Sequence, residues 1–187
     1  MKRLYSLSLL GAFWALLPGS PARAADDPPK IAQEDMGKAL RHLMLTSPPE
    51  EVEAKPTKEF PRVYAVLMDW PVGENTATVL STSTGEASLY TTSTFGIIGG
   101  AGREGVSEAA LKVVRAADAF FEEAKPVAKQ FPYPGPEQVF FYFLTFEGVR
   151  RVEANLAAIE SGSSPCTELF GLVQKVLTAL QKEPATK

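Results

Sequence analysis

The segment that most constrains the fold is residues 138–146, which read QVFFYFLTF and form the most apolar stretch beyond the N-terminal region. The stretch has the length of a β-strand and is rich in aromatic residues. Because successive side chains of a strand point to opposite faces of a sheet, an apolar residue at nearly every position requires cover on both faces. We therefore expect this strand at the centre of a sheet, covered on both sides or placed at a partner interface.

The preceding and following sequence predicts further antiparallel strands. Three stretches have strand length or alternate between apolar and polar residues, and they cover residues 62–70, 76–83 and 86–94. Short turns at 73–75 and 84–85 join them, which is typical of an antiparallel meander. A turn at 147–148 then leads from the aromatic stretch into a fifth strand at 149–154.

Apolar residues at helical spacing predict helices over residues 31–45, 106–124, 157–160 and 164–180. Gly37 weakens the first of these helices. In the last one, Ser164 followed by Pro165 fits an N-cap with proline at the first helical position. A proline-rich loop over 125–137 precedes the aromatic strand.

The element order α-βββ-α-ββ-α predicts an α+β domain, in which helices pack on an antiparallel sheet of about five strands. This order resembles that of the secretion-chaperone-like fold, a two-layer sandwich. The resemblance is topological and implies a sheet that can dimerise and bind an extended partner segment. We predict a flexible leader, the short helix and a Pro/Glu-rich linker over 25–61, a single α+β domain over 62–183 and a disordered tail over 184–187.

Residues 1–24 predict a secretory signal peptide. Lys2 and Arg3 supply the charged start, residues 4–17 are mostly apolar, and residues 22–24 (ARA) have the small-x-small pattern of a cleavage site. The apolar run is shorter than the roughly 20 residues of a membrane-spanning helix. We expect export to the periplasm or the extracellular space, with no stable membrane span after cleavage.

Charge and cysteine content exclude several classes of protein. The chain has 187 residues, with 19 Lys+Arg, 22 Asp+Glu, one His and one Cys. Loss of the three basic residues in 1–24 moves the net charge from -3 to -6. An acidic chain lacks the basic footprint of nucleic-acid-binding proteins. A single Cys excludes an intramolecular disulfide and a cysteine-based zinc cluster, and we assign no cofactor and no metal site.

The strongest candidate for a ligand site is the glycine-rich stretch 96–105 (GIIGGAGREG). Its last six residues match G-x-G-x-x-G between a strand and a helix, where glycine amides can approach a phosphate at the helix N-terminus. On this interpretation Gly99, Gly100, Gly102 and Arg103 form an anion nest. We favour a plain strand-to-helix crossover that needs positive φ, because the surrounding meander is not a βαβ unit and the Lys-Ser/Thr of a P-loop is absent.

Cys166 and His42 are the candidates for nucleophilic chemistry. Cys166 falls in the first turn of the last predicted helix, where a helix N-terminus lowers a thiol pKa, so a reactive thiolate is one interpretation. We favour the alternative of a small buried packing residue. His42 is the only imidazole base for a Ser or Cys nucleophile, and we favour a partly exposed surface histidine.

A group of acidic residues and an aromatic loop each allow more than one interpretation of their role. Asp69 lies in an otherwise apolar strand, and with Glu74 and Glu86 it suggests a carboxylate pair or an oxygen-ligand cation site. We favour a carboxylate that accepts hydrogen bonds from turn amides. The aromatic and proline-rich loop at 131–136 either docks on a partner or caps the sheet end, and we favour capping.

The sequence carries no G-x-S-x-G, H-E-x-x-H or S-x-x-K signature, so we assign no catalytic residue. Our first hypothesis is a small exported, non-catalytic binding or accessory protein of the bacterial envelope. Its partner would be another envelope protein or a second copy of the chain. The alternatives are a small exported enzyme that uses Cys166 or the loop at 96–105, and a protein that binds a small ligand between sheet and helices.

Overall fold

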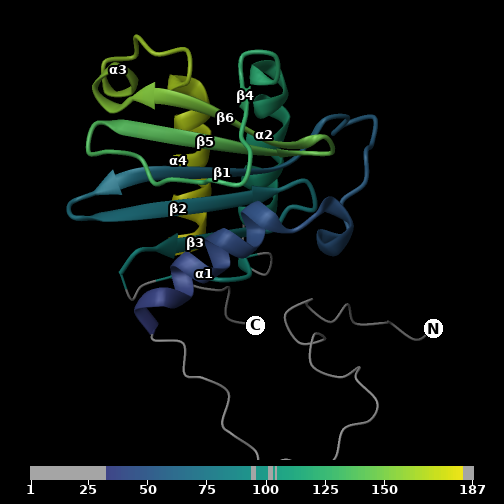
Figure 1. Ribbon diagram of the computed structural model, residues 1–187, viewed down its shortest axis with the longest axis horizontal. Coiled ribbons are helices and arrows are strands. Elements are labelled where there is room, and N and C mark those ends of the chain that lie inside the picture. The colour runs from purple at the N-terminus through teal and green to yellow at the C-terminus, as the bar shows by residue number, and fades with distance from the viewer. Residues whose placement is uncertain (1–32, 94–95, 101–102, 104, 183–187) are drawn as a thin grey trace, which may run out of the picture. The chain divides into compact units, whose positions relative to one another are not determined.

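The computed structural model describes residues 33–93, 96–100, 103 and 105–182, which form an antiparallel sheet with helices packed on it (Figure 1). The order of the strands across the sheet is β3-β2-β1-β5-β6-β4. The strands are β1 (Val63–Val72), β2 (Asn75–Thr82), β3 (Ala87–Thr91), β4 (Lys125–Pro126), β5 (Gln138–Thr145) and β6 (Gly148–Asn155). The helices are α1 (Gln33–Thr46), α2 (Val106–Ala117), α3 (Leu156–Glu160) and α4 (Thr167–Gln181), with 3-10 turns η2 (Pro49–Val52) and η4 (Asp118–Phe120).

The central pair of strands is β1 and β5, which run antiparallel with Val66 opposite Phe143 and Met68 opposite Phe141. Every residue of β5 after Gln138 is buried, on both faces of the sheet. The expectation from its continuous apolar sequence is therefore confirmed. Alternate residues of this strand belong to two separate hydrophobic clusters, one on each face.

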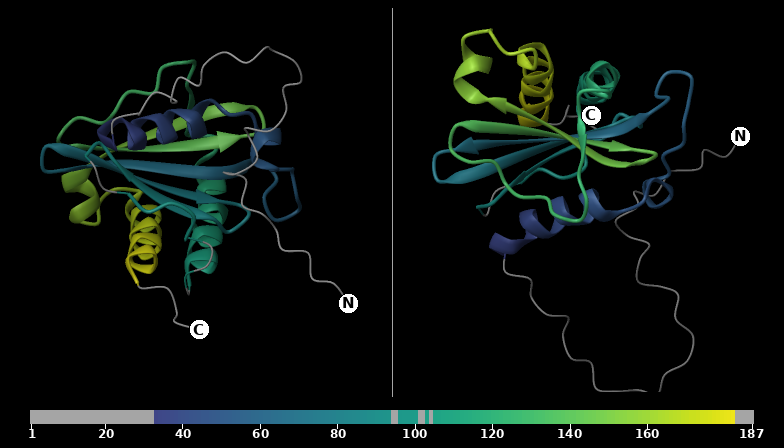
Figure 2. Two further views of the ribbon diagram at one scale, coloured as in Figure 1. Left: turned by 90° about the horizontal axis from the view of Figure 1, so that it is seen from below. Right: turned by 45° about the horizontal axis from the view of Figure 1, so that its top comes forward.

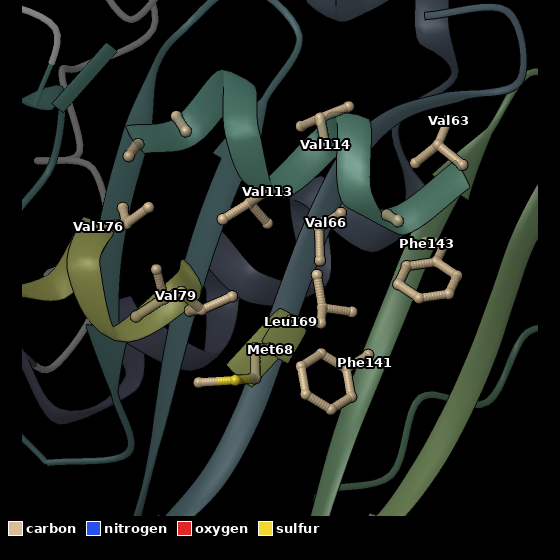
Figure 3. Packing of buried hydrophobic residues seen from close by; sticks show 14 of the residues in the cluster. Val63, Val66, Met68, Val79, Val113, Val114, Phe141, Phe143, Leu169 and Val176 are labelled. Carbon is tan, nitrogen blue, oxygen red and sulfur yellow. The ribbon is translucent and has the colours of Figure 1, made fainter. Parts of the chain in front are cut away.

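Helices α2 and α4 lie side by side on one face of the sheet (Figures 1 and 2). Their apolar stripes meet the side chains of β1, β2 and β5 in the larger cluster (Figure 3), which includes Val113 and Val114 of α2 and Leu169 and Val176 of α4. Full burial of a side chain of this size stabilises the fold by about 1.5–3 kcal/mol. Because the larger cluster holds more than twice as many buried residues as the smaller one, this layer contributes most of the hydrophobic stabilisation.

Helix α1 lies on the opposite face of the sheet from α2 and α4 (Figure 2). It contacts β3, and its Leu45 packs in the smaller cluster with Leu67 and Tyr142. Gly37 explains how the helix comes so near the sheet, because a Cβ at this position would lie 2.3 Å from the Thr91 carbonyl oxygen. The glycine that weakens the helix in isolation is the one that permits its docking.

The α+β class, with an antiparallel sheet and helices packed on it, is confirmed, and the sheet has six strands where about five were expected. The additional strand is β4, a two-residue edge strand inside the predicted proline-rich loop. The helix predicted over 106–124 ends at Ala117 and continues as η4. Residues 184–187 and the predicted signal peptide lie outside the described residues.

The predicted N-cap of the last helix is wrong. Helix α4 begins at Thr167 with Cys166 in the N-cap position, and Ser164 lies in the preceding turn. The Ser164 hydroxyl accepts a hydrogen bond from the Cys166 amide at 3.1 Å, and its carbonyl oxygen accepts one from the Thr167 amide. The serine therefore organises the turn before the helix.

None of the helices among the described residues combines the length and the apolar character that a membrane crossing requires. The short helix predicted within 25–61 is α1, and the predicted linker after it contains η2 and the buried residues Ala54 and Phe60.

Two helix-interior glycines provide a matched test of this packing. Gly37→Ala should lower the free energy of unfolding by about 1–3 kcal/mol, because overpacking against the Thr91 backbone outweighs the gain in helix propensity. Gly171→Ala in α4 should raise it by about 0.5–1 kcal/mol, because a Cβ there meets no atom within 4 Å. Urea unfolding followed by circular dichroism measures both. Equal stabilisation by the two alanines would contradict the close approach of α1 to β3.

Candidate functional site

The most polar buried site lies under α1, where Arg41 and Asp69 form an ion pair. The guanidinium Nε and Nη2 donate to Asp69 Oδ2 at 2.9 and 2.6 Å, and the two residues are 4% and 0% exposed. The other carboxylate oxygen, Oδ1, accepts a 2.5 Å hydrogen bond from the Thr78 hydroxyl of β2. The pair therefore connects α1 to the two strands β1 and β2.

The same guanidinium also holds the proline-rich loop. Its Nη1 donates to the carbonyl oxygen of Phe131 at 2.9 Å, and Nη2 donates to that of Pro132 at 3.2 Å. The Tyr142 hydroxyl of β5 donates to the same Pro132 oxygen at 2.6 Å. Arg41 Cζ lies 4.1 Å from the ring centroid of Tyr133. These contacts place the loop on the face of the sheet beside α1, and not at the sheet end where the capping interpretation put it.

The electrostatics of this site follow from its burial. Burial raises the pKa of the Asp69 carboxyl, while the hydrogen bond and the charge of Arg41 and the hydrogen bond from Thr78 act in the opposite direction. Burial likewise raises the pKa of the Tyr142 phenol. The carboxylate has no exposed surface and its hydrogen bonds are with Arg41 and Thr78, so the arrangement fixes α1 and the loop and gives no access to a substrate.

Asp69 does not have the partners that the sequence suggested. Its hydrogen bonds come from the side chains of Arg41 and Thr78 and not from turn amides, while Glu74 and Glu86 are exposed residues at the turns. Sequence reasoning missed Arg41, although a signal existed. Gly37, Arg41 and Leu45 are spaced by four and therefore share one face of the helix.

The glycine-rich stretch is described only in part, and Gly102 lies outside the described residues. Gly99 has φ 71°, and its amide donates to the Ser88 hydroxyl at 3.3 Å. Gly100 is buried, and a Cβ there would lie 2.3 Å from Leu180 Cδ2. The Arg103 guanidinium donates to the Lys182 carbonyl oxygen at the end of α4. The positive φ of Gly99 and the close approach at Gly100 are what a strand-to-helix crossover requires. The anion nest stays a prediction.

Cys166 and His42 lie on different elements. Cys166 is buried, 2% exposed, and packs in the larger hydrophobic cluster. Burial raises the pKa of its thiol, Ser164 lowers it in part, and the charge of Glu123 raises it. His42 is exposed on α1. The positions match the favoured interpretations of a packing residue and a surface histidine.

An accessible hollow lies elsewhere, on the exposed side of α2 and α4. It is a groove of about 320 Å³, with Ala109, Leu172 and Ala179 as its apolar lining residues. Its charged lining residues are Glu108, Lys112, Lys175 and Lys182. No sequence motif marks this groove, because its lining residues come from two helices that are far apart in the chain. The remaining lining residues are Gly105 and Thr178.

The α2–α4 groove runs between two antiparallel helices. Gly105 at the start of α2 and Lys182 at the end of α4 both line it, so the helices run antiparallel. Small side chains at Ala109 and Ala179 leave room between them. Lys175, Thr178 and Lys182 are spaced by three and four residues, which brings them to one side of α4.

In the described part of the chain, no group of three or more His, Cys, Asp or Glu side chains is arranged to hold a metal ion. Comparison of the chain with protein-family models, with curated proteins and with solved structures found no match.

The buried ion pair predicts a characteristic pattern of stability. Arg41→Met should lower the free energy of unfolding by about 3–5 kcal/mol, because it leaves the Asp69 charge buried without its partner. Adding Asp69→Leu to this variant should recover much of that loss. As a control, Arg115→Met removes an exposed ion pair with Glu59 and should cost about 1 kcal/mol or less. A double variant less stable than Arg41→Met in urea unfolding would contradict the prediction.

The buried thiol predicts slow chemistry at neutral pH. Because the pKa of Cys166 is raised in the folded chain, its contribution to stability is fully present below the ordinary thiol pKa of about 8.5 and is lost as pH rises through the folded pKa. A thiol reagent should label native Cys166 more slowly than a free model thiol, and urea should accelerate the reaction. Labelling at or above the model rate at pH 7 would instead support a reactive thiolate.

Proposed function

We propose that this chain is a small exported, non-catalytic binding protein that receives a partner in the α2–α4 groove. The observation that carries the proposal is the groove itself, an accessible hollow with apolar lining residues and lysines beside them. Its exposed charged side chains lie on α2 and α4, which the hydrophobic core holds in place. Partner surfaces of this kind combine an apolar centre with a charged rim.

The second support for a binding role comes from the residues that the sequence suggested for chemistry, because each of them makes its contacts inside the fold. The Asp69 carboxylate is paired with the Arg41 guanidinium, which also donates to carbonyl oxygens of the proline-rich loop. Cys166 is buried with a raised pKa, and Arg103 donates to the α4 terminus. Each of these groups stabilises the fold, while the groove leaves exposed lysines at the surface.

Site-specific photo-crosslinking in the exporting cell tests the proposal. A photoreactive residue is placed at Thr178, which is exposed in the groove, or at Thr84, an exposed control in the β2–β3 turn. A discrete adduct should form from position 178 and not from position 84. The adduct should appear in the exported fraction, on a chain whose N-terminus is Ala25.

Two results would contradict the proposal. Absence of an adduct from position 178, with the variant folded and exported, would remove the binding role of the groove. An intact N-terminus on a chain retained inside the cell would remove the exported location.

A further inference from the structure

The groove also indicates the chemistry of its occupant. We infer that the α2–α4 groove binds an acidic peptide segment of a partner protein, with one apolar side chain of that segment seated between the helices. The inference rests on the proposed function and adds the class of partner.

The charge of the groove is opposite to that of the chain. Among the described residues that line it, Lys112, Lys175 and Lys182 are accompanied by a single carboxylate, Glu108, whereas the whole chain has more acidic than basic residues. Lys112 and Glu108 form an ion pair at 2.6 Å, so the local excess is carried by the two α4 lysines. Both of these lysines are exposed. Complementary charge favours an acidic occupant and raises its rate of encounter.

The helix dipoles do not supply this preference. The N-terminus of α2 carries a partial positive charge, but the C-terminus of the antiparallel α4 lies at the same end and carries a partial negative one. The Arg103 guanidinium donates to the Lys182 carbonyl oxygen and so offsets the negative end of α4. The selectivity for anions is therefore a property of the side chains.

The apolar lining of the groove indicates that the occupant also carries an apolar side chain. Ala109 and Ala179 are small, and together with Leu172 they leave apolar surface between the rows of charges. A volume of about 320 Å³ is at the low end of the range for ligand pockets. It accommodates one apolar side chain and a short length of backbone. An acidic peptide with an apolar anchor satisfies both the lysines and the apolar surface.

The direct test uses a fluorescently labelled synthetic peptide of Asp and Glu residues with one central Leu. Fluorescence anisotropy with the purified exported chain should show saturable binding that weakens as salt rises from about 0.05 M to about 0.5 M, because salt screens exposed charges. Lys175→Glu should weaken binding about tenfold, since it removes one attraction and adds one repulsion.

Two controls separate the groove from general charge attraction. Lys55→Glu makes the same change in net charge at an exposed lysine outside the groove, and it should leave affinity within about twofold. Ala109→Leu fills the apolar lining without a change of charge and should also weaken binding. If that variant fails to fold, a peptide with Ala in place of Leu tests the same contact and should bind more weakly.

The outcomes distinguish this inference from the proposed function. No saturable binding by the unchanged chain, or equal weakening by Lys175→Glu and Lys55→Glu, would overturn the acidic occupant. A crosslink from position 178 that persists undiminished in Lys175→Glu would also reject it, while the binding role would stand. Peptide binding with no crosslink in the cell would support the groove chemistry and contradict the proposed function.

Discussion

The interaction on which one whole face of the sheet depends is the buried ion pair between Arg41 and Asp69. Moving two charges out of water is costly, and their attraction offsets the cost only where the remaining hydrogen-bonding groups find partners. Here the carboxylate accepts from Thr78, and the guanidinium also donates to two loop carbonyl oxygens. Helix α1 also packs Leu45 into the smaller cluster, while Met36 and Leu43 are exposed. The directional bonds of the pair act together with this apolar contact to define the position of the helix.

The sequence predicted the elements whose signals are local. The continuous apolar run of β5 required cover on both faces, and short turns predicted the meander. Contacts between distant segments had weaker signals, because the helix face shared by Gly37, Arg41 and Leu45 does not identify its partner. The short β4 depends on pairing with β6, and the partner of Asp69 lies 28 residues earlier in the chain. For the same reason the α2–α4 groove was not predicted, since it exists only once two separate helices have packed together.

The two faces of the sheet are stabilised in different ways. Under α2 and α4 the contacts are almost wholly apolar and tolerate changes that conserve volume. Under α1 the contacts combine aromatic rings, a backbone approach at Gly37 and a buried charge. The exposed sides of α2 and α4 are thus supported by a well-packed core. The backbone around the groove is therefore held by buried contacts on α2 and α4.

The distance along the chain between Arg41 and its carbonyl partners has a consequence for folding. The guanidinium bonds residues 90 and 91 positions away, so these contacts raise the contact order and form only after long loops have closed. Helix α1 precedes every strand in the sequence, yet it has no surface to dock on until β1, β2, β5 and the proline-rich loop are assembled. We therefore expect α1 to reach its native position only after these later segments of the chain have assembled.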